Sequence, residues 1–270
     1  MVSFLVGSFL MLSGGTRSVA TNSENVKPAV VVAETIPLNL EPLTNSINAI
    51  IAEYPGMDIG VSLVDIKTGE AQSYGVQVPF VAASTAKLLT AIAYLHDVEQ
   101  GKLSLDQQIG GQTAKKALEA LIINSDNQAW YDLNNIVMTH AELLEYANII
   151  GFTGYDPDSN TVIPSSLANL LSNLYQKRLL NEVNTNLLLS FMKRAKEVEY
   201  ITSIIPSGVS VYHKPGYLND RIHDALIIDG NNRPYVLVIF TKSRSANYDV
   251  QAGTDVFVRT AKATFATFLE

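Results

Sequence analysis

The first part of the chain alternates between helical and strand patterns of apolar residues. Between residues 38 and 54 the apolar positions recur with helical spacing, and Pro55-Gly56 ends the pattern. Met57–Asp65 then alternates in the manner of a strand, and Ala71–Tyr74 follows a turn at Lys67-Thr68-Gly69-Glu70. These segments predict a packing helix and then an antiparallel hairpin. The apolar positions that define the helix are Leu43, Ile47, Ile50 and Ile51.

The middle of the chain is a succession of helical patterns. Thr85–Gln100 is apolar on nearly every side and stops at Gly101, so it predicts a buried helix with a glycine cap. Further helical patterns, separated by polar loops, cover Thr113–Ile123, Asn127–Val137, Ala141–Ile150, Ser165–Tyr175 and Thr185–Ala195. We therefore expect a helical subdomain over about residues 84–200.

The last part of the chain returns to strands and ends in a helix. Strand patterns occupy Val209–Tyr217, Ile222–Ile228 and Tyr235–Thr241. One face of the final helical segment carries Phe257, Ala261, Phe265 and Phe268, which suits it to cover a sheet. Together these patterns predict an α+β fold in three αβα layers. Helices from both chain ends flank an antiparallel sheet, the helical subdomain is inserted, and a cleft lies between sheet and subdomain.

Composition excludes several classes of function. The chain has 270 residues, 47% of them hydrophobic, which is enough for a full core. Its net charge of −7 argues against a nucleic-acid binder. The absence of cysteine excludes disulfides, thiolate metal ligands and a cysteine nucleophile. The histidines follow no zinc-ligand spacing, so we expect neither a metal nor a cofactor; they are His96, His140, His213 and His223.

The N-terminal segment is similar to an export signal. Val2–Leu12 is an apolar run too short to span a bilayer, and the small residues Ser18-Val19-Ala20 follow it. We expect residues 1–20 to be a signal peptide or membrane anchor, 21–37 a linker, and 38–270 one globular domain. This organisation predicts export from the cytoplasm. A disordered or buried N-terminus is the alternative.

Ser84 and Lys87 form the first candidate for chemistry. Their i, i+3 spacing at the start of a buried helix puts both side chains on one face, where the amine can act as base for the hydroxyl. The N–H groups and positive dipole end of that helix favour the alkoxide that forms on attack. Because S-x-x-K is common by chance, the pattern gains its weight from this position. Residues 82–86 lack the glycines of the nucleophile elbow found in Ser-His-Asp hydrolases.

Two further elements follow in chain order. In Ser125-Asp126-Asn127, the serine hydroxyl could relay a proton to a leaving nitrogen, and the asparagine amide could hold a substrate carbonyl. The alternative is a helix N-cap, since the next helix begins here, and both interpretations can hold together. Lys214, on a later strand, could bind a substrate carboxylate or assist the Ser125 proton transfer. Two amines in one cleft repel, so Lys87 could be neutral while Lys214 stays charged.

These three elements resemble the S-x-x-K, S-D-N and K-T-G motifs of class A β-lactamases and penicillin-binding proteins, in the same order and at similar spacing. The resemblance extends from about Asn48 to the C-terminus, and it implies a β-lactamase- or transpeptidase-like fold. It also implies Ser84 as acylated nucleophile, Lys87 as base and Ser125 as proton shuttle. By the same resemblance Asn127, Lys214, Gly216 and Tyr217 bind substrate, and the backbone N–H groups of Ser84 and Tyr217 form an oxyanion hole.

The sequence departs from the family in the loop Phe152–Ile163. Class A β-lactamases carry there a Glu that activates the deacylating water, and this loop contains no Glu. Asp156 or Asp158 could substitute, although Asp-Pro-Asp-Ser-Asn is typical of a turn. Without such a base an acyl-enzyme would persist, which suits a penicillin-binding protein better than an efficient β-lactamase.

A second departure is Pro215, which stands where the family has Thr or Ser and removes a hydroxyl that helps to bind a substrate carboxylate. Proline also lacks an N–H, so we expect this strand to lie at an open sheet edge, where the backbone N–H side of positions 215 and 217 faces the cleft. Arg221 and His223 share one face of the next strand and could bind the carboxylate instead. A salt bridge is the alternative for Arg221, and Asp224, on the other face, is expected to be structural.

The sequence therefore predicts an exported serine hydrolase that forms a Ser84 acyl-enzyme with a small-molecule β-lactam or peptidoglycan-type substrate and deacylates slowly. A D-Ala-D-Ala peptidase or penicillin-binding protein and an esterase are the enzyme alternatives. A non-catalytic cell-wall binding module is the alternative from another class. We expect a monomer that binds no nucleic acid.

Overall fold

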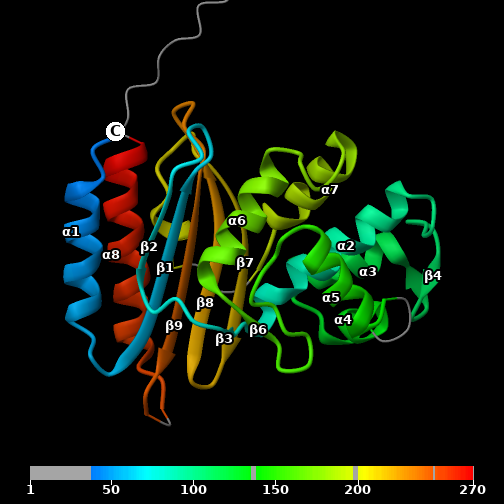
Figure 1. Cartoon of the computed structure of the whole chain (residues 1–270), viewed down its shortest axis with the longest axis horizontal. Coiled ribbons are helices and arrows are strands. Elements are labelled where there is room, and N and C mark those ends of the chain that lie inside the picture. Colours follow the sequence, from blue (N-terminus) through cyan, green and yellow to red (C-terminus); the bar gives the residue numbers. More distant parts are fainter. Residues whose placement is uncertain (1–37, 135–137, 197–199, 246, 270) are drawn as a thin grey trace, which may run out of the picture. The chain divides into compact units, whose positions relative to one another are not determined.

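A computed structural model describes residues 38–134, 138–196, 200–245 and 247–269. Its centre is a five-stranded antiparallel sheet with strand order β2-β1-β9-β8-β7 (Figure 1). The strands are β1 (Met57–Asp65), β2 (Ala71–Gly75), β7 (Ser210–Leu218), β8 (Arg221–Asp229) and β9 (Tyr235–Ser243). All five predicted strands are confirmed within a few residues. β7 is an edge strand, as the proline at position 215 requires.

Helices cover both faces of this sheet. On one face lie α1 (Glu41–Ala52) and α8 (Val250–Phe268), and on the other lies α6 (Pro164–Tyr175) (Figure 1). Strand β9 shows the division, because Leu237 and Ile239 pack with α1 and α8 while the alternate residues pack with α6. The predicted three-layer α+β fold is confirmed.

Helix α6 was counted with the helical subdomain in the sequence analysis, but it packs against β1, β8 and β9. Its apolar stripe, which includes Leu167, Leu171 and Leu174, is buried against the sheet. The remaining helical part consists of α2 (Lys87–Glu99), α3 (Ala114–Ile123), α4 (Asn127–Asp132), α5 (His140–Ile149) and α7 (Glu182–Met192). Periodicity identifies an apolar stripe correctly but does not say which neighbour covers it.

Helix α2 is the core of the helical part. All residues from Lys87 to Leu95 are buried, so every side of this part of the helix is covered. The helix ends at Glu99, and Gly101 follows in the left-handed region with φ of 69°. Its N-terminal extension is a 3₁₀ turn at Ala83–Ala86, which therefore carries the candidate nucleophile. The end of the predicted helix Asn127–Val137 lies outside the described residues.

Two short ladders escaped the sequence analysis. β3 (Phe80–Val81) pairs with β6 (Thr161–Val162), and β4 (Gln108–Ile109) pairs with β5 (Gln112–Thr113). Strands of two residues are too short to show an alternating pattern. The β3–β6 ladder matters for the site, because it joins the segment before Ser84 to the loop Phe152–Ile163.

The predicted signal or anchor (1–20) and linker (21–37) lie outside the described residues. Within the described part of the chain, none of the helices is both long enough and apolar enough to cross a membrane.

Gly75 ends strand β2 with φ of 66°, and a Cβ there would overlap the carbonyl oxygen of Ile59. Gly69, with φ of 78°, has open space around the same position and serves as a matched control. We expect Gly69→Ala to lower the free energy of unfolding by about 1 kcal/mol. Gly75→Ala should lower the free energy of unfolding by a further ~1–3 kcal/mol, because the backbone of Gly75 or Ile59 must move to make room for the Cβ. Urea unfolding of both variants measures the difference, and equal losses would contradict the close approach of β1 and β2.

Candidate active site

Ser84 lies in a strained turn between β3 and α2. Ala83, just before it, has φ of 50°, which is unfavourable for a residue with a Cβ. The turn is closed by Thr85, whose Oγ1 donates to the Ala82 carbonyl oxygen at 2.8 Å. Ser84 itself is half-buried at the first turn leading into α2. Strain of this kind persists only where the surroundings hold the backbone in place.

Lys87 is fully buried at the start of α2 and extends toward the turn before α4. Its Nζ donates to the carbonyl oxygen of Ser125 at 2.5 Å and to Asn127 Oδ1 at 2.7 Å, and it lies 3.5 Å from Ser125 Oγ. The ring of Trp130 lies 5.2 Å from the same nitrogen. The first two motifs, 38 residues apart between Lys87 and Ser125, therefore meet at the side-chain nitrogen of Lys87.

The turn that carries Ser125 both caps helix α4 and supplies side chains to the candidate site, so both interpretations of the Ser125-Asp126-Asn127 motif hold. Asp126 is the N-cap of α4 and accepts a hydrogen bond from Ala129 N at 2.8 Å. Ser125 has φ of 56°, and its hydroxyl is directed to the lysines rather than to the helix end. Capping is thus assigned to the central residue of the motif, while Ser125 and Asn127 face the site.

The third motif completes the site from the sheet. Lys214 on β7 is fully buried, and its Nζ donates to Ser125 Oγ at 2.8 Å. Two residues on, Gly216 lies against the nucleophile turn, since a Cβ there would be 2.9 Å from the Ala82 carbonyl oxygen and 3.1 Å from Ser84 N. Tyr217 follows with 51% of its surface exposed. The structure therefore brings Ser84, Lys87, Ser125, Asn127, Lys214 and Gly216 together.

His213 precedes Lys214 but points to the opposite face of the sheet, as neighbouring strand residues do. Its Nδ1 lies 3.1 Å from Asp224 Oδ2, and both side chains are buried. Burial opposes protonation of His213, but the charge of Asp224 and the hydrogen bond to it raise its pKa above the ordinary value. The expectation that Asp224 is structural agrees with this pairing.

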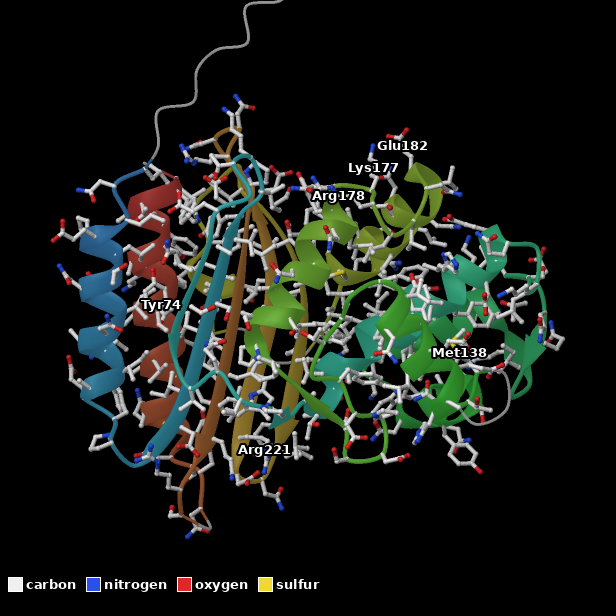
Figure 2. The ribbon with its side chains drawn as sticks, in the orientation of Figure 1. Tyr74, Met138, Lys177, Arg178, Glu182 and Arg221 are labelled. Carbon is white, nitrogen blue, oxygen red and sulfur yellow. The ribbon has the colours of Figure 1, made fainter. Side chains whose placement is uncertain are left out.

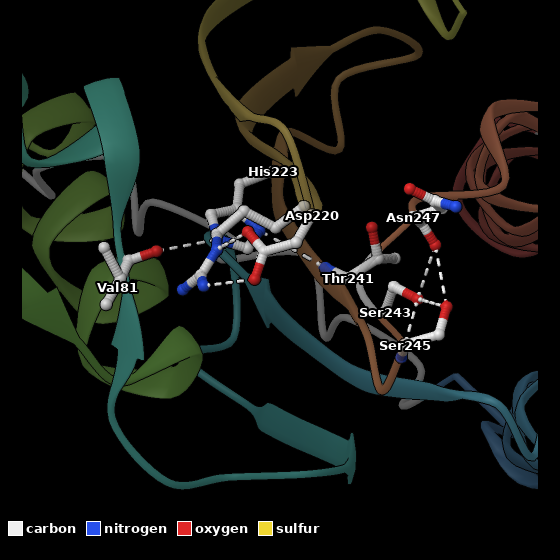
Figure 3. Close-up of polar contacts among 8 residues, drawn as sticks. Val81, Asp220, His223, Thr241, Ser243, Ser245 and Asn247 are labelled. Carbon is white, nitrogen blue, oxygen red and sulfur yellow. Dashed lines mark hydrogen bonds and ion pairs between the residues drawn. The ribbon is translucent and has the colours of Figure 1, made fainter.

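The prediction that His223 binds substrate does not match its surroundings. Its ring is wholly buried, stacked on Phe240 at 4.0 Å between centroids. Its Nε2 lies 3.0 Å from the Val81 carbonyl oxygen, and the Thr241 N–H donates to Nδ1 at 3.2 Å (Figure 3). Nδ1 also lies 2.8 Å from the Ile222 carbonyl oxygen. His223 points toward the nucleophile segment, as its strand position predicts, but it supports β3 from behind.

Arg221 also has a different role from the one predicted. Its Nε and Nη2 each donate to the Asp220 carboxylate at 2.6 Å, so the salt-bridge alternative is the one observed. Arg221 lies at the end of the sheet where β7 turns into β8 (Figure 2). There it lines a pocket of about 220 Å³ together with Lys242 and the segment 76–81, and Lys214 is not part of that lining.

Asp156 and Asp158, the alternative deacylation bases, both have other partners. Asp156 Oδ2 accepts a hydrogen bond from Ser159 Oγ at 2.7 Å, and Oδ1 accepts one from Asp158 N at 2.9 Å. These hydrogen bonds lower the pKa of Asp156, which weakens it as a base. Asp158 is 87% exposed in its side chain and pairs with His140 at 3.0 Å. The turn interpretation of this segment is the one that the contacts support.

Several residues that shape the site escaped the sequence analysis. Trp130 Nε1 donates to Thr90 Oγ1 at 3.0 Å, and Thr90 Oγ1 donates to Asn134 Oδ1 at 2.9 Å, which fixes α4 on α2. Asn160 contacts the nucleophile turn from the loop Phe152–Ile163. The position of the single Trp, three residues after the S-D-N motif, was an available signal. No local pattern marks Thr90 or Asn160.

A family model described as the beta-lactamase enzyme family matches residues 42–268. The chain belongs to this family. Among curated relatives, β-lactamase CARB-3 of Pseudomonas aeruginosa is 24% identical over 225 residues, covering 70% of this chain and 78% of the relative. β-Lactamase PSE-4 of the same organism is 22% identical over 246 residues, covering 78% and 85%. This β-lactamase family member is therefore a serine hydrolase.

Solved structures agree on the fold of this β-lactamase family member. An ancestral class A β-lactamase superposes with a TM-score of 0.77 at 23% identity, covering 84% of this chain and all of the other. A mutant of PBP-A, solved as an acyl-enzyme complex with penicillin G, superposes with a TM-score of 0.76 at 21% identity, covering 86% and 98%. The predicted β-lactamase-like fold is confirmed.

His223 should make the stability of the protein depend on pH. Burial lowers its pKa from 6.5 to about 4, so between these values the unfolded chain binds a proton that the folded chain does not. The free energy of unfolding should therefore fall as pH decreases from 6.5 to 4, by up to about 1.4 kcal/mol per unit from this group. Urea unfolding of wild type and His223→Gln across this range should show the steeper fall in wild type. Parallel curves would contradict a buried neutral ring.

Proposed function

We propose that this protein acts by acyl transfer through Ser84 on a strained or D-configured amide, a β-lactam or a peptidoglycan-type peptide. The observation that carries the proposal is the placement of Ser125 Oγ between two buried lysines, 3.5 Å from Lys87 Nζ and 2.8 Å from Lys214 Nζ. A hydroxyl held between two amines can pass a proton in either direction, which is what expulsion of a leaving nitrogen needs.

In the first step Ser84 Oγ attacks the carbonyl carbon of the amide, and its proton passes to the neutral amine of Lys87. The negative charge that develops on the carbonyl oxygen is held by the N–H groups of Ser84 and Tyr217. Ser125 donates its proton to the nitrogen as the C–N bond breaks, and it regains one from the Lys87 ammonium. Lys214 stays charged and lowers the cost of the transient Ser125 alkoxide.

Release of the acyl group should be slow. The loop Phe152–Ile163 has no Glu, the carboxylate of Asp156 is hydrogen-bonded within the loop, and that of Asp158 is exposed and paired with His140. Water would attack the ester without a well-placed base. A long-lived acyl-enzyme favours a penicillin-binding or D-Ala-D-Ala peptidase role, with efficient β-lactam turnover as the alternative.

An esterase is a second candidate, favoured by one feature of β7. Pro215 offers neither the hydroxyl nor the N–H that would help hold a substrate carboxylate, and Arg221 is paired with Asp220. Recognition of a substrate carboxylate would then rest on Lys214 alone among these residues. A neutral ester would therefore bind almost as well as a substrate that carries a carboxylate. The non-catalytic cell-wall module is disfavoured, because two buried lysines converge on the hydroxyl of Ser125, an arrangement suited to proton transfer. We also propose export and a monomeric state.

Intact-mass measurement of the purified protein incubated with penicillin G tests the proposal. We expect one adduct per chain, of the mass of the intact penicillin, that persists over many minutes because deacylation lacks a base. Ser84→Ala should remain unmodified. Ser203→Ala, which changes an exposed serine far along the chain, should acylate as wild type does.

The alternatives give different results in the same samples. No adduct together with unhydrolysed penicillin would overturn the β-lactam reaction, and Ser84-dependent hydrolysis of a p-nitrophenyl ester would then establish the esterase. Rapid loss of penicillin without an adduct would establish fast deacylation instead.

A further inference from the structure

Asn160, in the loop Phe152–Ile163, holds two successive residues of the nucleophile turn. Its side-chain Nδ2 donates to the Ala83 carbonyl oxygen at 3.1 Å, and its own carbonyl oxygen accepts from Ala82 N at 2.7 Å. Asn160 has φ of 51°, a conformation that Asn tolerates better than most residues. One residue of the loop thus clamps the backbone on the N-terminal side of Ser84.

The geometry of the peptide bond gives this clamp a chemical meaning. The Ala83 C=O and the Ser84 N–H belong to one planar trans peptide unit, so they point in opposite directions and rotate together. A hydrogen bond that fixes the carbonyl therefore fixes the N–H as well. Ser84 is the second residue of the 3₁₀ turn Ala83–Ala86, and the first N–H groups of a helix have no partner within it, so this donor can serve an incoming group.

The turn needs such support, because Ala83 is held at φ of 50°. For a residue with a Cβ this conformation is unfavourable, which favours rotation of the adjoining peptide units. Gly216 of β7 blocks movement on one side, since its Cα is close enough that a Cβ would be 3.1 Å from Ser84 N. Asn160 opposes rotation of the Ala83–Ser84 peptide unit through its hydrogen bond to the Ala83 carbonyl oxygen.

We propose that Asn160 is a positioning residue that directs the Ser84 N–H into the oxyanion hole. This inference rests on the proposed acyl transfer at Ser84. The loop Phe152–Ile163, which has no Glu to act as deacylation base, would then take part in acylation. Asn160 acts through the Ala83–Ser84 peptide and does not touch the substrate.

The loop is built rigidly enough to serve as such a clamp. Asp156 and Thr161 exchange two backbone hydrogen bonds of 3.0 and 3.1 Å, which closes the segment around Asn160. The β3–β6 ladder pairs Val81 with Thr161. Val81 directly precedes Ala82 in the nucleophile segment, and Thr161 directly follows Asn160 in the loop. The amide of Asn160 is therefore carried by a backbone that is tied both to itself and to the nucleophile strand.

Two substitutions separate the side-chain amide from the backbone conformation. Asn160→Gly keeps the left-handed backbone and removes the donor, whereas Asn160→Asp keeps the shape and replaces the donor with oxygen. Ser159→Ala is the matched control, because it changes the neighbouring exposed residue, whose hydroxyl contacts Asp156 and not the turn. All three are compared with wild type by stopped-flow acylation with a fluorescent penicillin, which gives the dissociation constant of the non-covalent complex and the acylation rate constant separately.

We expect the acylation rate constant of Asn160→Gly and Asn160→Asp to fall about a hundredfold, the loss that accompanies removal of one oxyanion donor. The dissociation constant should stay within about twofold of wild type, because the oxyanion is absent from the ground state. Ser159→Ala should match wild type. In Asn160→Asp the deficit should shrink as pH falls below about 4, since a protonated carboxyl can again donate to the Ala83 carbonyl.

The outcomes are distinguishable. If wild type forms no adduct with the penicillin and hydrolyses no p-nitrophenyl ester, acyl transfer itself fails and the role of Asn160 falls with it. If wild type acylates and the Asn160 variants keep rate constants within about threefold, the positioning role is overturned. It is also overturned if rate, affinity and thermal midpoint decline together without recovery at low pH, because a general loosening of the loop would then account for the loss.

Discussion

The hydroxyl of Ser125 is bound by two lysine side chains that have no exposed surface, and this contact determines how the surrounding elements are placed. A lysine nitrogen buried in a protein must find fixed oxygen atoms as hydrogen-bond acceptors, because a buried polar group that has lost its hydration without a partner costs several kcal/mol. Lys87 finds them in the turn before α4, and Lys214 reaches the same turn from β7. A helix of the core, a turn of the helical part and an edge strand of the sheet are therefore tied to one point.

The constraint explains the local backbone of the site. Ser125 adopts a left-handed conformation, Ala83 does the same before Ser84, and Gly216 has no room for a side chain. Each is unfavourable or restrictive on its own. Together they allow α2, the α4 turn and β7 to approach more closely than regular elements would, so that three hydrogen-bonding side chains meet within a few ångströms.

Long elements and the residues of the three motifs could be predicted from the sequence, because helix and strand periods extend over many residues. What could not be predicted depends on partners distant in the chain. The stripe of α6 looked like that of any helix beside it, and only the packed structure shows that the sheet covers it. His223 lies on the expected strand face, but the register places Val81 and Phe240 around it, so it supports β3 instead of meeting a ligand.

Proline at position 215 has a consequence beyond substrate recognition. β7 is the outermost strand, and an unpaired strand edge is a template on which another chain can add a strand. A proline interrupts the row of N–H donors along that edge, and the exposed Tyr217 next to it widens the obstruction. The residue that deprives a ligand of one hydroxyl thus also removes one of the N–H donors on which strand pairing at this edge would depend.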